Sequence, residues 1–375
     1  MRLLSASKID EDFRIVSRTL ERWFPMPAML MPPAAGVDIS DSSVKWVVLE
    51  RATDTARVQS YGELPLEAGI VVSGKVLNVA ALGAALSEVR THLGGVHVAH
   101  SALPEEAAYV FSMIVPHATP REQVLRMIEF EFEGRVPIAP SAAVYDYSPM
   151  PVQSGEEEEI GVVVFPKDVA EAYVASFEVA GMTLVSLELE ARSIARAVST
   201  GMPDEPITLI VDYGRARTGF AVLKRGVPIF TSTVAMGGDA IDRALIESAH
   251  VTGENAMRFK LEEGIDASPQ FAAERTAIMG TVTGFAEEIA KHYRYWDTRK
   301  NDHGDRMTPI GKVVLVGGHA SLRGLADFVA SKVQAPVELG KCWRHVTDFD
   351  VYIPPIDQHA SLQYASAIGL ALRTL

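Results

Sequence analysis

One sequence pattern occurs twice in this chain, 174 residues apart, and it constrains the fold more than any other feature. Each copy is a short apolar run that reaches an aspartate, turns through small or polar residues, and resumes as a β-rich run. The pattern predicts a strand, a tight hairpin and a second strand in each half of the chain. The two copies are Val37-Asp38-Ile39-Ser40 with Val44 to Leu49, and Val211-Asp212-Tyr213-Gly214 with Thr218 to Leu223.

The aspartate beside each predicted turn gives the pattern a chemical use. Backbone N–H groups that point out of a turn can bind phosphate oxygens, and a nearby carboxylate can hold Mg²⁺ or a water molecule. A single Asp-plus-turn is more often only a hairpin. Two such turns that face each other, with Asp38 and Asp212, would bind a nucleotide from both sides.

Two glycine pairs follow at the second half of the chain. Gly237-Gly238 comes before Asp239, which we expect to cap a helix, and Gly317-Gly318 ends an apolar strand and comes before Ser321, a second expected cap. A lone Gly-Gly mostly marks a tight turn. Between a strand and a helix it also lets a ligand approach the helix N-terminus, so both pairs are candidate nucleotide contacts.

Composition narrows the functional class. The 375 residues are enough for two or three domains, and the net charge of −13 with no basic patch disfavours a nucleic-acid partner. A single cysteine, Cys342, cannot form an internal disulfide and favours a reducing cytosol. The apolar stretch Trp23 to Val37 contains four prolines and is interpreted as a linker. Residues 1–22 have helical amphipathic spacing, which predicts a leader that docks on a protein surface or, alternatively, on a membrane surface.

Other enzyme classes lack their motifs. There is no Walker pattern and no Gly-x-Ser-x-Gly elbow, which argues against a P-loop ATPase and an α/β-hydrolase. His97 and His100 would point to opposite faces of a strand, which disfavours a shared zinc ion.

The order of these motifs resembles the actin-like ATPase superfamily and, within it, the PilM family of type IV pilus assembly, over roughly residues 35–375. This resemblance implies an α/β, actin-like (ribonuclease H-like duplicated) fold with two lobes around a nucleotide cleft and a small inserted α+β subdomain. Further segments carry it: Ala102-Leu103-Pro104, Glu129 to Ile138, Ala180-Gly181-Met182, Phe285 to Ile289 and Ala365 to Leu372. The implied divisions are 1–34 (leader and linker), 35–105 (first lobe), 106–188 (inserted partner-binding subdomain), 189–205 (connection), 206–354 (second lobe) and 355–375 (C-terminal helix returning to the first lobe).

The resemblance also implies a set of ATP and Mg²⁺ contacts. The first phosphate and metal loop is Asp38, Ser40, Ser42, Ser43 and Lys45, and the second is Asp212, Gly214, Arg215 and Thr218. Gly237, Gly238 and Lys260 would flank the ribose and phosphates, and Gly317, Gly318 and Leu322 would cover the adenine. Asp38 and Asp212 are the expected metal ligands, while Glu190 is the candidate for positioning water.

Two departures from the family pattern limit the expected activity. Family members often show Asp-Ile-Gly-Ser at the first turn, whereas this chain has Asp38-Ile39-Ser40-Asp41. A carboxylate about 4 Å from the phosphates costs roughly 1 to 4 kcal/mol unless Mg²⁺ or Lys45 intervenes, and the alternative is that Asp41 faces solvent and caps the turn. Met257 also stands where an acidic residue commonly holds the ribose. We therefore expect at most a weak ATPase, and a pseudo-ATPase scaffold that binds no nucleotide is an alternative.

By resemblance, the expected function is an ATP-binding cytoplasmic scaffold at the inner face of the cytoplasmic membrane. Its partner would be the short cytoplasmic tail of a PilN-like inner-membrane protein, bound in a nucleotide-dependent way, with self-association open. Candidate contacts surround a helix break in the inserted subdomain, although the same residues could instead fill its core: Phe132, Arg135, Val136 and Ile138.

The sequence disfavours two rival functions. An FtsA-like membrane tether of cell division usually ends in a basic amphipathic helix, and the last residues here carry only Arg373. A sugar or acetate-type kinase would need a general base between the lobes, and the sequence offers no identifiable one.

Overall fold

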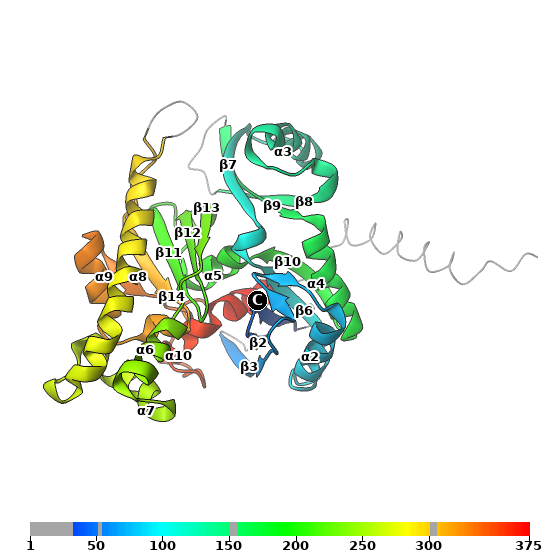
Figure 1. Ribbon diagram of the computed structural model, residues 1–375. Helices are drawn as coiled ribbons and strands as arrows, with labels where there is room; N and C mark the ends of the chain where they lie inside the picture. The colour runs from blue at the N-terminus through cyan, green and yellow to red at the C-terminus, as the bar shows by residue number, and fades with distance from the viewer. Residues whose placement is uncertain (1–32, 52–54, 151–156, 301–305) are drawn as a thin grey trace, which may run out of the picture.

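Two five-stranded sheets with the same strand order form the framework of the molecule (Figure 1). The computed structural model describes residues 33–51, 55–150, 157–300 and 306–375. The expected leader over residues 1–22 lies outside the described residues. No helix within the described ranges is long and apolar enough to cross a membrane.

The first sheet has the order β10-β6-β1-β2-β3. Strand β1 pairs in antiparallel fashion with β2 and in parallel with β6, and β10 extends the parallel side. The five strands are β1 (Ala35–Ile39), β2 (Ser43–Arg51), β3 (Ala56–Pro65), β6 (Val98–Leu103) and β10 (Thr183–Leu189). Strands β4 (Val71–Val72) and β5 (Lys75–Val76) form a small separate hairpin beside it.

The second sheet repeats this arrangement with the order β13-β12-β11-β14-β15. Its strands are β11 (Thr208–Tyr213), β12 (Thr218–Lys224), β13 (Val227–Val234), β14 (Lys312–Val316) and β15 (Val337–Leu339). The hairpin register repeats as well, since Asp38 lies opposite Lys45 and Asp212 opposite Gly219. The sequence repeat thus corresponds to a structural duplication, which confirms the predicted fold class.

A smaller unit is inserted between β6 and β10. It consists of β7 (Tyr109–Pro116), α3 (Arg121–Arg135), β8 (Ala143–Pro149) and β9 (Glu157–Pro166), and it has an apolar core of its own. Helix α4 (Lys167–Val179) packs on α2 (Val79–Thr91) of the first lobe instead. The expected range 106–188 therefore includes α4 and β10, which pack and pair with the first sheet.

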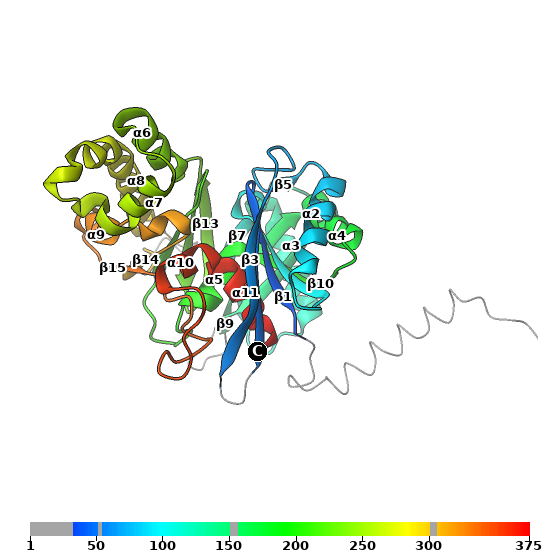
Figure 2. The ribbon, with the colours of Figure 1, turned by 90° about the horizontal axis from the view of Figure 1, so that it is seen from below.

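Two short helices lie side by side between the sheets (Figure 2). These are α5 (Glu190–Val198), which follows the first sheet, and α11 (Ala365–Ala371), which follows the second sheet but packs on β1 and β2. A Cβ atom at Gly369 would lie 1.8 Å from the carbonyl oxygen of Ser193, so glycine permits this close approach. The pair forms the connection between the lobes.

The remaining helices mostly surround the second sheet. They are α6 (Asp239–Ala249), α7 (Gly253–Arg258), α8 (Ala272–Thr298), α9 (Leu325–Val333) and α10 (Gln358–Ser361). One-turn helices include Glu105–Ala107, Pro140–Ala142, Gly264–Asp266, Pro269–Phe271, Gly318–Ser321, Leu362–Tyr364 and Leu372–Thr374, and Phe259–Glu263 is a π-helical turn.

Both helix caps predicted from the sequence are wrong. Helix α6 begins at Asp239 itself, with Gly238 in the cap position. Helix α9 begins after Gly324, whose φ of +80° suits glycine, while the Ser321 hydroxyl bonds to the Gly318 carbonyl in the preceding turn. Helix α6 thus begins one residue earlier than the cap pattern predicts, and α9 begins three residues later.

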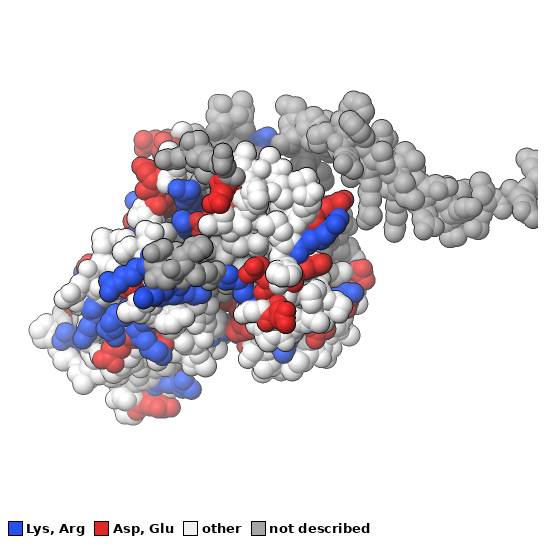
Figure 3. Space-filling view, turned by 90° about the horizontal axis from the view of Figure 1, so that it is seen from above, with Lys and Arg blue, Asp and Glu red and all other residues white. Residues whose placement is uncertain are grey.

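Charged side chains of both signs occur on the face of the molecule that is seen from above (Figure 3). Figure 3 shows acidic and basic side chains intermixed on the face seen from above, with a denser basic group over the second lobe at the left. The net charge of the chain remains −13.

Candidate functional site

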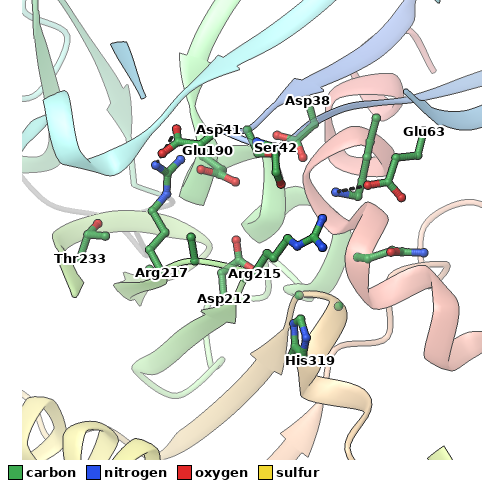
Figure 4. A pocket seen from close by; sticks show the side chains of 18 of the residues that line it. Asp38, Asp41, Ser42, Glu63, Glu190, Asp212, Arg215, Arg217, Thr233 and His319 are labelled. Atoms are coloured by element: carbon green, nitrogen blue, oxygen red, sulfur yellow. Dashed lines mark hydrogen bonds and ion pairs between the residues drawn. The ribbon is translucent and has the colours of Figure 1, made fainter. Parts of the chain in front are cut away.

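The two repeated hairpins face each other across a cavity of about 330 Å³ (Figure 4). One wall is the turn at Ser40–Ser42, here called the first turn, and the opposite wall is the second turn at Gly214–Arg217. Asp38 and Asp212 line the cavity from the ends of β1 and β11. The duplication thus brings together residues that are far apart in the sequence.

Most of the predicted nucleotide contacts line this cavity. The ones that do are Asp38, Ser40, Ser42, Lys45, Glu190, Asp212, Gly214, Arg215, Lys260, Gly317 and Gly318. The predicted residues outside its lining are Ser43, Thr218, Gly237, Gly238 and Leu322. Ser43 and Thr218 support the turns: the Ser43 hydroxyl accepts a hydrogen bond from Lys45 Nζ (3.1 Å), and the buried Thr218 hydroxyl donates to the Met236 carbonyl (2.6 Å). Leu322 is buried in the core.

The two glycine pairs differ in what they permit. A Cβ atom at Gly237 would lie 2.2 Å from the Arg215 carbonyl oxygen, and one at Gly238 would lie 1.9 Å from the His319 ring. This pair therefore lets the second turn and His319 pack closely. Gly317 has a φ of +91°, and a Cβ atom there would lie 2.4 Å from Asp212 Oδ1, so this glycine keeps the space around the Asp212 carboxylate open.

The two turns offer unequal sets of phosphate donors. In the first turn, the Ser40 amide bonds to the Ser43 carbonyl, and the Ser42 and Ser43 amides donate to Ser40 Oγ. In the second turn, the amides of Arg215 and Ala216 have no hydrogen-bond partner among the described residues. The second turn is therefore the better prepared anion site.

Asp41 lines the cavity, and its carboxylate caps a neighbouring turn rather than its own. Its carboxylate accepts hydrogen bonds from the amides of Ser73 (2.9 Å) and Gly74 (3.1 Å), in the turn between β4 and β5. It also forms an ion pair with Arg217 (3.1 Å). The Asp41 carboxylate is thus bound by other groups of the protein, and its charge is paired with the Arg217 guanidinium.

Arg217 crosses the cavity from the second turn, and the sequence reasoning missed it. Figure 4 shows its side chain extending toward Asp41, and its Nε also lies 2.7 Å from Glu106 Oε1. Asp41 belongs to the first lobe, and Glu106 lies in the one-turn helix between β6 and the inserted subdomain. The available signal was its place in the second repeat, two residues after Arg215, but only the fold reveals what lies opposite it.

Four carboxyl groups converge on the cavity, and their ionisation is suppressed. Burial, followed by the Asp38 charge, raises the pKa of Asp212 to about 6, and burial raises the pKa of Glu105 to about 7. Burial and the Glu105 carboxyl raise the pKa of Glu190 well above its usual range, and burial also raises that of Asp38, against the effect of Lys45. Such a cluster favours the binding of a positively charged species.

A second group of polar side chains lines the far end of the cavity, and only Lys260 was predicted. Lys260 Nζ lies 2.6 Å from Asp242 Oδ1, and His319 Nε2 lies 3.5 Å from Asp242 Oδ2. These contacts, with burial opposing them, lower the pKa of Asp242 to about 2. Met257 and Asp242 both line the cavity, and the Asp242 carboxylate is bound by Lys260 and His319.

The lining of the cavity fits a nucleotide that brings its own metal ion. Within the described ranges, no group of three or more His, Cys, Asp or Glu side chains is arranged to hold a metal ion by itself. The clustered carboxyls with raised pKa values, together with the open amides of Arg215 and Ala216, nonetheless fit a ligand that brings phosphates and its own cation. The residues present therefore fit a nucleotide with a bound cation. Phosphate and water oxygens, rather than protein side chains, would supply most of the atoms that coordinate the cation.

The four predicted partner contacts lie in or beside the core of the inserted subdomain. Phe132 and Val136 are 2% and 7% exposed, and Ile138 packs against the same cluster. Arg135 pairs with Glu131 (2.8 Å) and lies over the Phe111 ring. This location is the alternative that the sequence left open.

A groove lies instead between the inserted subdomain and the first lobe. It has a volume of about 580 Å³ and is lined by β8, by β10, and by Val227 and Pro228 at the start of β13. We call it the interlobe groove. Strands β8 and β10 are both at the end of their sheets, so each has one unpaired edge. Arg192, Arg196 and Arg373 also line it, and the last two share the carboxylate of Glu188.

Comparison with known proteins gives a family and several structural neighbours. Residues 36–375 match the family described as type IV pilus assembly protein PilM. The cell division protein FtsA of Enterococcus faecalis is 25% identical over 350 residues, covering 81% of this chain and 77% of that protein.

Among solved structures, a PilM-PilN type IV pilus biogenesis complex aligns with a TM-score of 0.72 at 20% identity, covering 91% of this chain and 98% of that one. The ethanolamine utilization protein EutJ of Carboxydothermus hydrogenoformans has a TM-score of 0.52 at 18% identity, covering 98% of both chains. MreB5 of Spiroplasma citri bound to ADP has a TM-score of 0.52 at 11% identity, covering 92% and 96%. At these identities the structures establish a shared fold.

Proposed function

The chain belongs to the PilM family of type IV pilus assembly proteins, and from this premise we propose that it is a nucleotide-binding scaffold that holds the tail of a PilN-like membrane partner. The observation that carries the proposal is the geometry of two ligand sites. The cavity between the turns and the interlobe groove are both bordered by each of the two lobes. Closure of the lobes on one ligand would therefore alter the site for the other.

The nucleotide site would use the two repeated turns. Phosphate oxygens would accept hydrogen bonds from the open amides of Arg215 and Ala216, and Lys45 and Arg215 would add positive charge. Bound Mg²⁺ would neutralise the phosphates and the carboxylates of Asp38 and Asp212. The MreB5 structure with ADP supports a nucleotide in a cleft of this fold.

Hydrolysis would be weak at most. Burial and the Glu105 carboxyl raise the pKa of Glu190 well above its usual range, so its neutral, protonated form is favoured more than in an exposed glutamate. A protonated carboxyl cannot accept a proton from water. The nucleotide would then act mainly as a ligand that sets the closure of the two lobes.

The interlobe groove is the proposed site for the partner's tail. An extended peptide could pair with the free edge of β8 or β10 and place apolar side chains against Val144 and Val185, which are 37% and 60% exposed. The three arginines outnumber the carboxylates of Glu188 and Asp146 that line the same groove. We therefore expect the tail to include an acidic side chain.

Nucleotide dependence would follow from the walls of the groove. Val227 and Pro228 come from the second lobe, whereas β8 and β10 belong to the inserted subdomain and the first lobe. A Cβ atom at Gly161 of β9 would lie 2.5 Å from Val227 Cγ1, so the inserted sheet and β13 touch directly. Rotation of the second lobe would change the width of the groove.

The test is peptide binding by fluorescence anisotropy, with a labelled synthetic tail of the PilN-like partner, in the presence and absence of ATP-Mg²⁺. Val185→Lys should weaken binding at least about tenfold, or ~1.4 kcal/mol, because it places a charge on the apolar edge of β10. Val179→Lys is the matched control, since Val179 is 59% exposed and lies outside the groove. Equal binding by both variants would place the partner elsewhere, and identical affinities with and without nucleotide would exclude the coupling.

The scaffold would work in the cytoplasm, at the inner face of the cytoplasmic membrane, where its membrane-anchored partner holds it. Self-association stays a prediction that analytical ultracentrifugation with and without nucleotide can check. The pseudo-ATPase alternative predicts no calorimetric signal with ATP-Mg²⁺. A loss of peptide binding in Val185→Lys would then support the partner site without the nucleotide site.

A further inference from the structure

We propose that the guanidinium group of Arg217 holds the two lobes closed across the cleft when no ligand is bound. The proposal concerns the protein alone and does not depend on nucleotide binding. Arg217 lies in the second turn, between β11 and β12 of the second lobe. Its partner Asp41 belongs to the first lobe, and its partner Glu106 lies in the one-turn helix Glu105–Ala107 that leads from β6 of the first lobe into the inserted subdomain.

The contact is a two-carboxylate clamp on one guanidinium. Arg217 Nη1 lies 3.1 Å from Asp41 Oδ1, and Arg217 Nε lies 2.7 Å from Glu106 Oε1. The exposed fractions of the three side chains are 20%, 30% and 19%, so solvent screens the pairs only in part. Two different nitrogen atoms bind two different acceptors, which fixes both the distance and the direction between the lobes.

The acceptor on the first lobe is held in place before Arg217 reaches it. The amides of Ser73 and Gly74 donate to the two oxygens of the Asp41 carboxylate. Both residues have positive φ angles, +48° and +70°, as the tight turn between β4 and β5 requires. Because this turn orients Asp41, the ion pair with Arg217 requires little further ordering of the acceptor.

Other contacts also join the second lobe to the rest of the molecule, at positions away from the clamp. Strand β12 begins at the clamp, beside Arg217, and ends at Lys224, which forms an ion pair with Glu159 of the inserted subdomain. The packed pair α5 and α11 also joins the lobes. Loss of the Arg217 contacts would leave these other connections in place, so the lobes should rotate apart at the cleft and stay attached.

Repulsion between the carboxyl groups in the cleft favours separation of the lobes, and the charge of Arg217 opposes it. Asp38 belongs to the first lobe and Asp212 to the second. Besides burial, the Asp38 charge raises the pKa of Asp212, and the Arg217 charge lowers the pKa of both groups, so Arg217 offsets part of the repulsion. A guanidinium fixed by two ion pairs does this without a bound metal.

The experiment measures the distance between the lobes in the ligand-free protein by pulsed electron spin resonance. Spin labels are placed at Glu67→Cys of the first lobe and Glu254→Cys of α7, two exposed positions on opposite sides of the cleft. Cys342 is buried and stays unlabelled under native conditions. Arg217→Ala should give a longer and broader distance distribution than the parent.

Arg215→Ala is the matched control for this measurement. It removes an arginine two residues away in the same turn, and the ion pair that it breaks, with Asp239, lies within the second lobe. Its distance distribution should equal that of the parent. An unchanged distribution in Arg217→Ala, or an equal change in Arg215→Ala, would overturn the proposal.

A second variant covers the case in which Arg217→Ala fails to fold. Asp41→Asn combined with Glu106→Gln removes both acceptors and keeps Arg217 itself. This protein should show the same opening as Arg217→Ala, and adding Arg217→Ala to it should change the distribution no further. A doubly substituted protein with the parental distance would refute the clamp.

Discussion

At the scale of single residues, the cleft gathers the carboxyl groups of Asp38, Glu105, Glu190 and Asp212 in a partly desolvated place. Burial, with added repulsion from neighbouring carboxyls, raises their pKa values, and a bound cation would offset both effects. These groups therefore oppose the stability of the empty protein, while they favour binding of a cation-bearing ligand. Substitutions in the cluster should separate the two effects.

Asp212→Asn should move ligand affinity and stability in different directions. It removes a carboxylate that we propose to face the nucleotide-bound metal ion, so affinity for ATP-Mg²⁺ by calorimetric titration should fall at least about tenfold, or ~1.4 kcal/mol. Because the pKa of Asp212 is raised to about 6, a neutral side chain suits the folded state at pH 7.5, and the melting temperature without ligand should hold or rise. Parental affinity in this variant would contradict the site assignment, while a drop in melting temperature would contradict the electrostatic argument.

Stability should depend on pH through Glu105. Its pKa is raised from 4.5 to about 7, so the folded state binds more protons than the unfolded state between these values. Stability of the ligand-free protein should therefore fall as pH rises from about 4.5 to 7, and the Asp212 carboxyl acts in the same sense. Melting temperatures from pH 5 to 8 should fall less steeply in Glu105→Gln than in the parent. Glu254→Gln, at an exposed position, is the control, and parallel curves for all three proteins would count against the prediction.

Sequence reasoning found the residues that the repeat itself carries. Asp38 and Asp212 were predictable because a strand-terminal aspartate beside a polar turn is a local pattern. Glu105, Arg217, Asp242 and His319 were not, because their role arises from the packing of elements distant in the chain. The second-turn position of Arg217 was visible, but its partners Asp41 and Glu106 were not.

At the scale of elements, the helices α5 and α11 are in contact through a glycine. Both hairpins were predictable from the apolar runs on either side of a polar turn, since hairpin pairing is local. The α5 and α11 contact was not, because it joins residues more than 170 positions apart, such as Ser193 and Ser366. The predicted helix caps failed for a related reason: Gly238 accommodates the His319 ring, which the local pattern does not include.

Gly369→Ala should destabilise the protein by about 1 to 3 kcal/mol, because the new Cβ atom would lie 1.8 Å from the Ser193 carbonyl oxygen and force α5 and α11 apart. Gly280→Ala is the matched control in α8, where nothing lies within 4 Å of the new atom, and it should stabilise by roughly 0.5 to 1 kcal/mol. Urea unfolding of the two variants measures both effects. A Gly369→Ala protein as stable as the parent would show that the helices are free to separate.

At the scale of the whole molecule, two lobes, one inserted unit and two connecting helices surround both candidate sites. The duplicated fold was predictable because the repeat covers both halves. The extent of the inserted unit was less accessible, because α4 and β10 follow it in the chain but join the first lobe. The interlobe groove depends on all three units, so no local pattern identifies it.

Turnover by the isolated protein should be negligible. The first turn has its Ser40, Ser42 and Ser43 amides bonded internally, which leaves fewer donors for phosphate, and the raised pKa of Glu190 disfavours the carboxylate form that would accept a proton from water. Steady-state phosphate release should stay well below ~1 per second, against the typical ~10 per second of enzymes. Release at enzyme-like rates, absent from an Asp212→Asn control, would contradict the scaffold proposal and indicate a catalytic ATPase.

The unpaired edges of β8 and β10 have a consequence for the life of the protein in the cell. Open strand edges are templates for pairing with other chains, and proteins commonly protect them. A bound tail that paired with one of these edges would act as that protection. The scaffold would then be most prone to aggregate when it is made in excess of its partner, so its abundance and solubility should follow the supply of the tail that occupies the groove.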